Sequence, residues 1–524
     1  MAQAAGDYLI VPMQPTPNGR LHLGHASGPY LRADVLARSL RRFGHRVSVV
    51  SGSDVYENWV LLDSVANGRA PEQTCRHFHR LIAEDLAHLG VRLDAYVNPL
   101  DPEHARPYKE IHEAVMARLA ANGRLRRVRE WFPVSSGSGR YLVGVWLIGR
   151  CPHCGASAAG NACEDCGHHF QPSEIREPRS RLDEGPVAWR QQTCWFLQPE
   201  AIDPVVRALD ACEVQDDITA VARRYVEQTG GRIRLTMPGS WGLKGRYCEP
   251  DTVICNTFYA YSLYCGAVAA RRRRQSVNPF AASSGVTTIG LFGLDNAIAG
   301  LVGPIATALS HGALRPFDHV SVNHFLSLHG QKFSTSRRHG IWVSDLIART
   351  SVTADEVRLY LARCGPEEGP SDFDARRFLA DTNRLRRILA TRVAPALAQL
   401  PADGDRVGDP SLARRLDDAL GRQRQALAPA RLSLAGGVAV LDAWLADEEM
   451  ARADPARWLT GTALLGEPFM PGLAGELWSA LGGRGRPAIG APLRSGEAGR
   501  PVRMPSAALG EAELRPHVHV AEPA

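Results

Sequence analysis

Within the first 45 residues, a continuously apolar run is followed by an amphipathic segment. Residues 8–13, YLIVPM, are apolar and end at a Pro/Asn/Gly cluster, a pattern that predicts a buried parallel strand and then a tight loop. Beyond the loop, apolar side chains recur at helical spacing, and Gly44 is suited to cap the helix. They are Leu31, Val35, Leu36, Leu40 and Phe43. The pattern predicts a strand, a loop and a helix, with PTPNGRLHLGH at the junction.

Further along the chain, the same kind of pattern predicts more elements. Residues 46–54, RVSVVSGSD, read as a second buried strand that ends in Asp54, and residues 59–128 are helical in pattern. From about Arg232 we expect the sheet to resume, and VTTIGLFGLDN forms another buried strand. Thr353 to Glu356 is a capping box, and a second amphipathic helix follows it. Its apolar positions are Phe378, Leu385, Ile388, Leu389, Val393 and Leu397. We therefore expect an α/β fold followed by a helical bundle.

The junction carries the first candidate chemistry. The predicted geometry puts His22 and His25 at the start of a helix, where free N–H groups and the helix dipole favour a phosphate. Gly24, between them, leaves room for a flat ring to approach. Taken alone, two histidines at a strand-to-helix turn are equally consistent with a turn that binds nothing. Asp54 also has two readings, as a ligand at a strand end or as the cap of the next helix.

Composition narrows the class of protein. The 524 residues are too many for a single core, so we expect three or four units. There is no apolar stretch of about 18 residues and no N-terminal signal pattern, so we expect a cytoplasmic protein without a membrane partner. The net charge of +6 is compatible with an RNA partner. Of the 61 basic residues only Lys109, Lys244 and Lys332 are lysines, and Lys332 lies in the segment GQKFSTSRR.

Four cysteines form a C-x2-C-x8-C-x2-C array. They are Cys151, Cys154, Cys163 and Cys166. Two CxxC pairs in a cytoplasmic chain indicate zinc, and four thiolates fill a tetrahedral site with no open position. We therefore expect a structural Zn²⁺, with a redox role for one pair as the weaker alternative.

Four segments in this order, PNGRLHLGH, the cysteine array, GLDN and KFSTS, resemble the signatures of class I aminoacyl-tRNA synthetases of the methionyl-tRNA synthetase family. The resemblance covers about residues 8–480 and implies a Rossmann (HUP-type) nucleotide-binding fold, split by a zinc-knuckle insertion and followed by an α-helical bundle. The implied units are 1–115 and 226–340 for the two halves of the catalytic domain and 116–225 for the insertion. Residues 341–481 would be an anticodon-binding-like bundle, and 482–524 a loosely ordered tail.

The resemblance also implies roles for individual residues, with ATP and Mg²⁺ as cofactors. Catalysis would fall to His22, His25, Lys332 and Arg337. ATP would be bound by Gly24, Gly293, Asp295, Asn296, Lys332 and Ser334. The amino-acid pocket would comprise Met13, Thr16, Asp54, Ile254, Phe258, Tyr261, Ala299 and Gly300, with Asp54 on the α-ammonium group.

The chain departs from the family pattern at chemically relevant positions. Thr335 stands where the loop has its second lysine, which Arg337 or Arg338 could replace, and Leu294 stands in place of the lysine of FGKDN. The aromatic side chains that wrap methionine in the family have no counterpart at the aligned Thr16, Ile254, Ala299 and Gly300. The resemblance therefore favours a pocket for a smaller or more polar amino acid.

Three functions stay open at this point. The first is a monomeric ligase that joins an amino acid to tRNA, with its anticodon reading in doubt because no Pro-Trp with the family spacing is found. The second is a paralogue that uses the same adenylate to acylate a small molecule or carrier. The third is a non-catalytic RNA- or partner-binding protein, which the loss of charge at Leu294 and Thr335 would fit.

Overall fold

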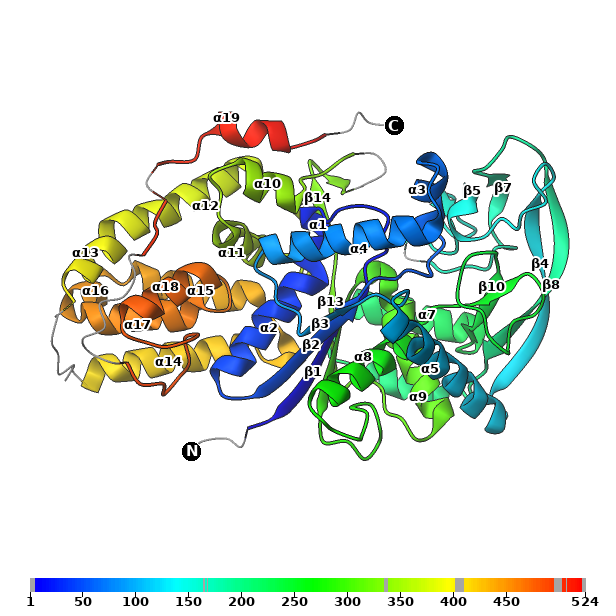
Figure 1. Cartoon of the computed structure of the whole chain (residues 1–524), viewed down its shortest axis with the longest axis horizontal. Helices are drawn as coiled ribbons and strands as arrows, with labels where there is room; N and C mark the ends of the chain where they lie inside the picture. The colour runs from blue at the N-terminus through cyan, green and yellow to red at the C-terminus, as the bar shows by residue number, and fades with distance from the viewer. Residues whose placement is uncertain are drawn as a thin grey trace.

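A parallel five-stranded sheet lies at the centre of the computed structural model (Figure 1), which describes residues 5–163, 165–166, 168–333, 338–400, 410–493, 502–505 and 507–520. Its strands are β1 (Asp7–Pro12), β2 (Arg46–Gly52), β3 (Ala95–Val97), β12 (Thr287–Gly293) and β13 (His319–Asn323). They are ordered β13-β12-β1-β2-β3, and every neighbouring pair is parallel. This is a doubly wound sheet whose order reverses between β1 and β12, where such folds bind their ligands.

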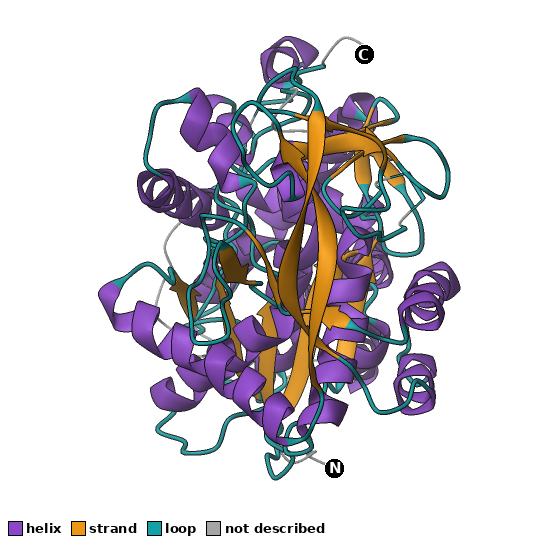
Figure 2. Ribbon diagram, turned by 90° about the vertical axis from the view of Figure 1, so that its right-hand side faces the viewer, coloured by secondary structure: helices purple, strands orange, loops and turns teal. Residues whose placement is uncertain are grey.

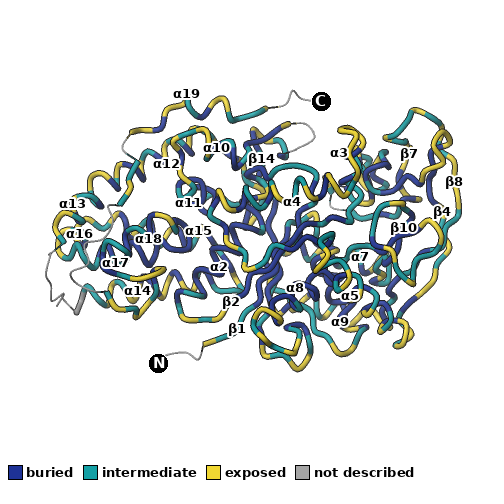
Figure 3. Tube along the Cα trace, viewed as in Figure 1, coloured by how far each residue is buried: buried dark blue, intermediate teal, exposed yellow. Residues whose placement is uncertain are grey.

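Both faces of the sheet are buried, which explains why its strands are continuously apolar. Ile10 belongs to the core on one face, and Leu9 and Val11 belong to the core on the other, since successive side chains of a strand alternate. Figure 3 shows this burial concentrated on β1, β2 and the segments packed against them. The strands expected at residues 8–13, at 46–54 and before GLDN are present as β1, β2 and β12. The first helix is also confirmed, because it continues to Arg42 and the following Gly44 has a φ of +83°, which suits a cap.

The helices around the sheet are α1 (Leu23–His25), α2 (Leu31–Arg42), α3 (Val60–Ala66), α4 (Pro71–His88), α5 (Pro102–Ala121), α8 (Phe258–Arg272), α9 (Gly303–His311) and α10 (Val343–Arg349). The expectation that residues 59–128 are helical is wrong in two places. β3 interrupts the helices as the edge strand of the sheet, and β4 begins at Leu125. A three-residue strand between two long helices is too short to show a period of its own.

In sequence between β3 and β12, the chain forms a separate β-rich unit. This unit faces the viewer in Figure 2. Its elements are β4 (Leu125–Ser135), β5 (Leu147–Arg150), β6 (Ser157–Ala159), β7 (Arg176–Ser180), β8 (Val187–Leu197), β9 (Ile233–Arg234), α6 (Asp203–Asp210) and α7 (Asp216–Thr229). β4 and β8 pair antiparallel along their whole length. The expectation that the main sheet resumes near Arg232 is wrong. β10 (Thr236–Pro238) and β11 (Thr252–Ile254) form their own two-stranded sheet, and the main sheet resumes only with β12.

The C-terminal part is the expected helical bundle. After β14 (Leu326–Leu328), β15 (Gln331–Lys332) and β16 (Ser371–Phe373), its helices are α11 (Ala354–Cys364), α12 (Ala375–Ile388), α13 (Ala394–Ala398), α14 (Pro410–Ala426), α15 (Leu434–Ala446), α16 (Glu448–Ala453), α17 (Pro455–Gly466) and α18 (Pro471–Ala480). The capping box is confirmed, since the Thr353 hydroxyl accepts from the Glu356 N–H at 3.2 Å and Glu356 accepts from the Thr353 N–H at 2.8 Å. No helix in the described part of the chain is long and apolar enough to cross a membrane.

Buried ion pairs tie the bundle to the part of the chain that surrounds the central sheet. On α2, Asp34 accepts from Arg38 at 2.7 Å and pairs with the fully buried Arg358 of α11 at 2.7 Å. Arg38 also pairs with Glu467 at 2.9 Å. The two guanidinium groups lower the pKa of Asp34 despite its burial. Because each charge is buried, removing one partner would leave a buried charge without compensation. The network therefore favours this one arrangement of the two parts.

Candidate active site

The HLGH segment follows β1 after a loop of residues 13–21. His22 is the N-cap of α1, and its Nδ1 accepts the backbone N–H of His25 at 3.2 Å. The Nδ1 atom therefore carries no proton, so the neutral ring presents its Nε2–H as a donor. The rings of His22 and His25 stack with centroids 3.8 Å apart. A side chain at Gly24 would lie 3.1 Å from the His22 ring and 3.2 Å from Phe333, so these neighbours would have to shift slightly to admit one.

Both histidines have lowered pKa values in the free protein. Burial, His25 and Lys332 hold the pKa of His22 well below its usual value. The surrounding protein and the Lys332 ammonium lower the pKa of His25 to about 4, although part of this residue is exposed. A polyanion bound beside the rings and Lys332 would offset the effect of the Lys332 charge. The His22 ring thus offers an Nε2–H donor that suits a phosphate oxygen.

The second strand end at the crevice belongs to β12. Gly293 closes this strand, and Asp295 and Asn296 follow in a single 3₁₀ turn, Leu294–Asn296. Asn296 donates to Asp295 at 3.1 Å, and the Asp295 residue is exposed. A side chain at Gly293 would come within 2.8 Å of the Asp295 carboxylate. β1 and β12 are neighbours, so HLGH and GLDN lie on the two sides of the point where the strand order reverses.

Of the KFSTS segment, Lys332 and Phe333 belong to the described residues, whereas Ser334, Thr335, Ser336 and Arg337 lie outside them. The Lys332 ammonium lies 4.1 Å from the centre of the Phe325 ring. Phe333 is buried and packs beside His22, with ring centroids 5.2 Å apart. Lys332 also influences the pKa of both histidines, so the structure brings this lysine near HLGH.

Asp54 follows β2 and joins a buried polar network. Its backbone N–H donates to the Pro15 carbonyl at 2.9 Å, and its carboxylate accepts from the Asn256 amide at 2.5 Å. Asn256 in turn accepts a hydrogen bond from the Tyr108 hydroxyl. Burial and the neighbouring Glu57 carboxylate raise the pKa of Asp54 well above its usual value. Among the described residues, no Lys or Arg pairs with Asp54, so an ammonium group on a ligand would satisfy this carboxylate.

The other residues expected in the amino-acid pocket lie in different environments. Tyr261 is fully buried and donates to Ser51 at 3.2 Å, and Phe258 packs against Phe292, with ring centroids 5.9 Å apart. A side chain at Gly300 would meet the Phe292 ring at 2.5 Å. The remaining members are Met13, whose N–H donates to Leu291, the half-buried Thr16, the buried Ile254 and the exposed Ala299.

Aromatic rings that we did not predict lie beside Asp54. The ring of Tyr56 is 6.1 Å from that of Tyr108 and 6.3 Å from that of Trp241, whose indole N–H donates to Val55 at 2.9 Å. Tyr56 also lines an open cavity of about 390 Å³, together with Lys109 and Lys244. Asn256 lies two residues after Ile254, in a segment where the sequence departs from the family pattern. Tyr108 and Trp241 carried no such signal, because their positions depend on long-range packing.

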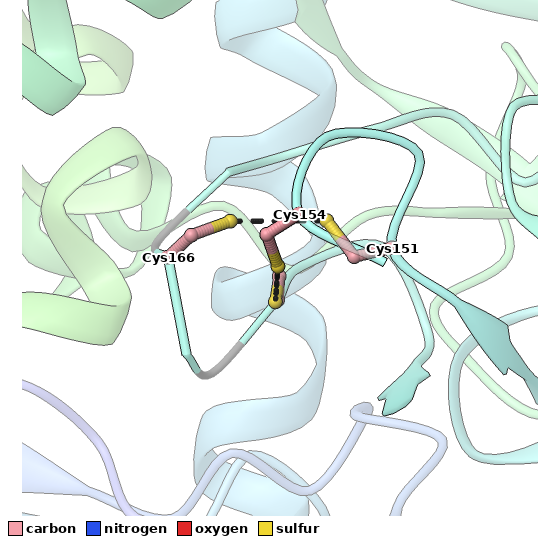
Figure 4. A group of neighbouring side chains, drawn as sticks. Cys151, Cys154 and Cys166 are labelled. Carbon is pink, nitrogen blue, oxygen red and sulfur yellow. Dashed lines mark hydrogen bonds between the residues drawn. The ribbon is translucent and has the colours of Figure 1, made fainter. Parts of the chain in front are cut away.

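The four cysteines converge in the inserted unit (Figure 4), and all four sulfur atoms lie within 4.8 Å of one another. Cys151 and Cys166 are 3.8 Å apart, and Cys154 and Cys163 are 3.6 Å apart. A tetrahedral zinc with Zn–S bonds of about 2.3 Å requires sulfur–sulfur distances of about 3.8 Å. The residues therefore fit a closed Zn²⁺ site, which would supply structure and not catalysis.

A doubly wound sheet, two strand-end signatures at its reversal point and an inserted thiolate cluster together define a nucleotide-binding fold of the class I synthetase type. The family model "tRNA synthetases class I (M)" matches residues 8–389. The chain belongs to this family.

Relatives support the same assignment. The methionine–tRNA ligase of Roseiflexus sp. (strain RS-1) is 29% identical over 396 residues, which are 72% of this chain and 65% of that protein. The methionine–tRNA ligase of Nocardioides sp. is 27% identical over 90% of this chain and 87% of its own length. The chain thus spans slightly less than two thirds of the first relative. A Mycobacterium tuberculosis methionyl-tRNA synthetase structure bound by methionyl-adenylate matches with a TM-score of 0.70 at 17% identity, covering 96% of this chain and 99% of that one.

Proposed function

We propose that this protein activates an amino acid with Mg²⁺·ATP and transfers the acyl group to tRNA. One observation carries the proposal. The HLGH segment follows β1 and Asp295 follows β12, the two adjacent strands between which the sheet order reverses, and Phe333, the residue after Lys332, contacts His22. The four cysteines are the only metal-ligating cluster among the described residues, so Mg²⁺ would enter as a complex with ATP. There it would reduce the repulsion between the phosphates of ATP.

In this proposal, each signature has a role in adenylate formation. The substrate carboxylate attacks the α-phosphorus of ATP, and pyrophosphate leaves. The Nε2–H of His22 and the ring of His25 donate to phosphate oxygens, and Lys332, aided by Arg337 or Arg338, neutralises the leaving pyrophosphate. Asp295 accepts from the ribose hydroxyls, with Gly24, Gly293, Asn296 and Ser334 completing the nucleotide site. Charge stabilisation of this kind counts most in the transition state.

The amino-acid side of the site is bound by Asp54. We propose that its carboxylate pairs with the α-ammonium group of the substrate. Asn256 donates to this carboxylate and accepts from the Tyr108 hydroxyl, so the two residues hold the carboxylate in place. The side-chain pocket is altered relative to methionyl enzymes, because Thr16, Ile254, Ala299 and Gly300 replace aromatic positions and Phe292 occupies the space beside Gly300. We propose that methionine is not the best substrate and that a smaller or more polar amino acid is preferred.

A second function, acylation of a small molecule or carrier, is favoured by the same altered pocket. It shares the adenylation step and differs only in the acceptor. The monomeric state, the cytoplasmic location and the predicted domain boundaries stay predictions.

Pyrophosphate exchange across the proteinogenic amino acids tests the first step. We expect exchange with at least one amino acid, and methionine ranking first in kcat/KM by tenfold or more would overturn the altered pocket. Transfer of the labelled acyl group to total tRNA then separates the two acceptors. Exchange without transfer to tRNA would favour the small-molecule alternative, and no exchange with any amino acid would favour a non-catalytic binding protein.

A further inference from the structure

The C-terminal tail is docked on the bundle over its described residues 507–520. Leu509 and Leu514 are 4% and 1% exposed, and both belong to the large core shared by the bundle and one face of the sheet. Asn383 of α12 makes two hydrogen bonds with the backbone of Leu509, at 3.0 and 2.8 Å. We expected residues 482–524 to be loose, whereas this part of them is packed, and Figure 1 shows α19 (Glu511–Leu514) beside α12.

Two further contacts anchor the tail. Arg386 donates to the Ala507 carbonyl at 2.7 Å while pairing with the buried Glu356. The Glu513 carboxylate accepts the backbone N–H of Ser351, and this bond lowers the pKa of Glu513. The tail is therefore held before α19 and within it, close to its last described residues.

Those last residues add a strand beside the proposed ATP site. His519 forms an antiparallel bridge with Gly340, through an N–H donated by Gly340 at 2.9 Å and one donated by His519 at 3.1 Å. On its other side, the 340–342 segment pairs with HLGH, since Leu23 donates to Ile341 at 2.9 Å and His22 and Trp342 form a second bridge. The result is a patch joined by two isolated antiparallel bridges, in which the segment after the KFSTS loop lies between the tail and His22.

Packing at the centre of this patch is close. A side chain at Gly340 would lie 2.9 Å from the Phe333 ring and 3.6 Å from the His22 side chain. Phe333 and His22 are themselves in contact, and Lys332 precedes Phe333 directly. A shift of the Gly340 backbone would therefore displace both Phe333 and His22, and with them the groups proposed to contact the phosphates.

We propose that the tail strand around His519 is a positioning element for adenylation, which holds Gly340 against Phe333 and His22. The inference rests on the proposed function, because it assigns the tail to the same site. The tail contacts the site through the 340–342 segment, which lies between His519 and His22, so its effect is indirect. It acts on the rate of the chemical step, where misplacement of charged groups by about 1 Å can cost up to 10²-fold.

The test uses three variants of the full protein. The first ends after His517, so that α19 stays docked and the bridging strand is lost. The second, His519→Pro, removes the N–H that donates to Gly340. The control, Val520→Pro, places the same ring at the next residue, which is 54% exposed. Pyrophosphate exchange gives kcat and the two KM values, thermal unfolding gives Tm, and hydrogen exchange by mass spectrometry reports the amides of residues 338–343.

We expect the truncation and His519→Pro to lower kcat roughly tenfold or more, with the KM for the amino acid and Tm near wild type, and to accelerate exchange at residues 338–343. Val520→Pro should match wild type. Unchanged kcat in both variants, or an equal loss in the control, would overturn the proposal. If the wild-type protein shows no pyrophosphate exchange, the proposed function fails separately. Hydrogen exchange then decides alone, and unchanged protection of residues 338–343 in the truncation overturns the positioning role.

Discussion

His22 has two separable roles in this structure, and substitution can distinguish them. Its Nδ1 caps α1 by accepting the His25 N–H at 3.2 Å, and its Nε2–H is the proposed phosphate donor. Asn is among the best N-cap residues and can accept the same N–H through its amide oxygen. His22→Asn should therefore keep the cap and lose the ring donor, whereas His22→Ala should lose both.

The magnitudes of the two losses follow from these contacts. Removing the cap costs about 1 kcal/mol of stability, and losing one preorganised donor costs roughly 10²–10³-fold in adenylation rate. We expect His22→Asn to unfold in urea at nearly the wild-type midpoint while pyrophosphate exchange falls about 10²-fold or more. His22→Ala should show the same rate loss and a lower midpoint.

The matched control is His77→Ala on α4, whose ring packs on its neighbour Phe78. It should leave the exchange rate unchanged. Wild-type exchange in His22→Asn would refute the role assigned to the ring, and an unchanged midpoint in His22→Ala would refute the cap.

Three further predictions concern other parts of the protein. Metal analysis should find about one zinc per chain, and chelation or Cys163→Ser should lower Tm; a chain that is folded and fully active without metal would contradict the site. Lys332→Ala should lower the rate of adenylation by about 10²-fold. Arg337→Ala or Arg338→Ala, each made alone in the wild-type protein, should also lower this rate. If Thr335→Lys speeds the reaction while both arginine variants are neutral, the site is simply weakened. Burial lowers the pKa of His112 to about 3, so the unfolded chain binds a proton that the folded chain does not between pH 6.5 and 3. His112 should therefore contribute about 2 kcal/mol to the stability lost on going from pH 7.5 to 5, so that urea unfolding shows a loss smaller by that amount in His112→Leu than in the wild-type protein.

The sequence by itself determined the parts whose information is local. The β1–HLGH–α2 unit follows from an apolar run, a turn and a helical period, and the capping box at Thr353 is a four-residue pattern. The cysteine array specified a tetrahedral thiolate cluster because two knuckles of fixed spacing constrain their own geometry. Resemblance at four ordered segments identified the family.

Tertiary structure alone decided what depends on segments far apart in the chain. The network from Tyr108 through Asn256 to Asp54 joins three segments, and no periodicity links them. The docking of His519 on Gly340 closes a loop of almost 180 residues, in a tail whose composition gave no sign of order. Local patterns report which face of an element is apolar, whereas the partner of that face is chosen by packing across the whole fold.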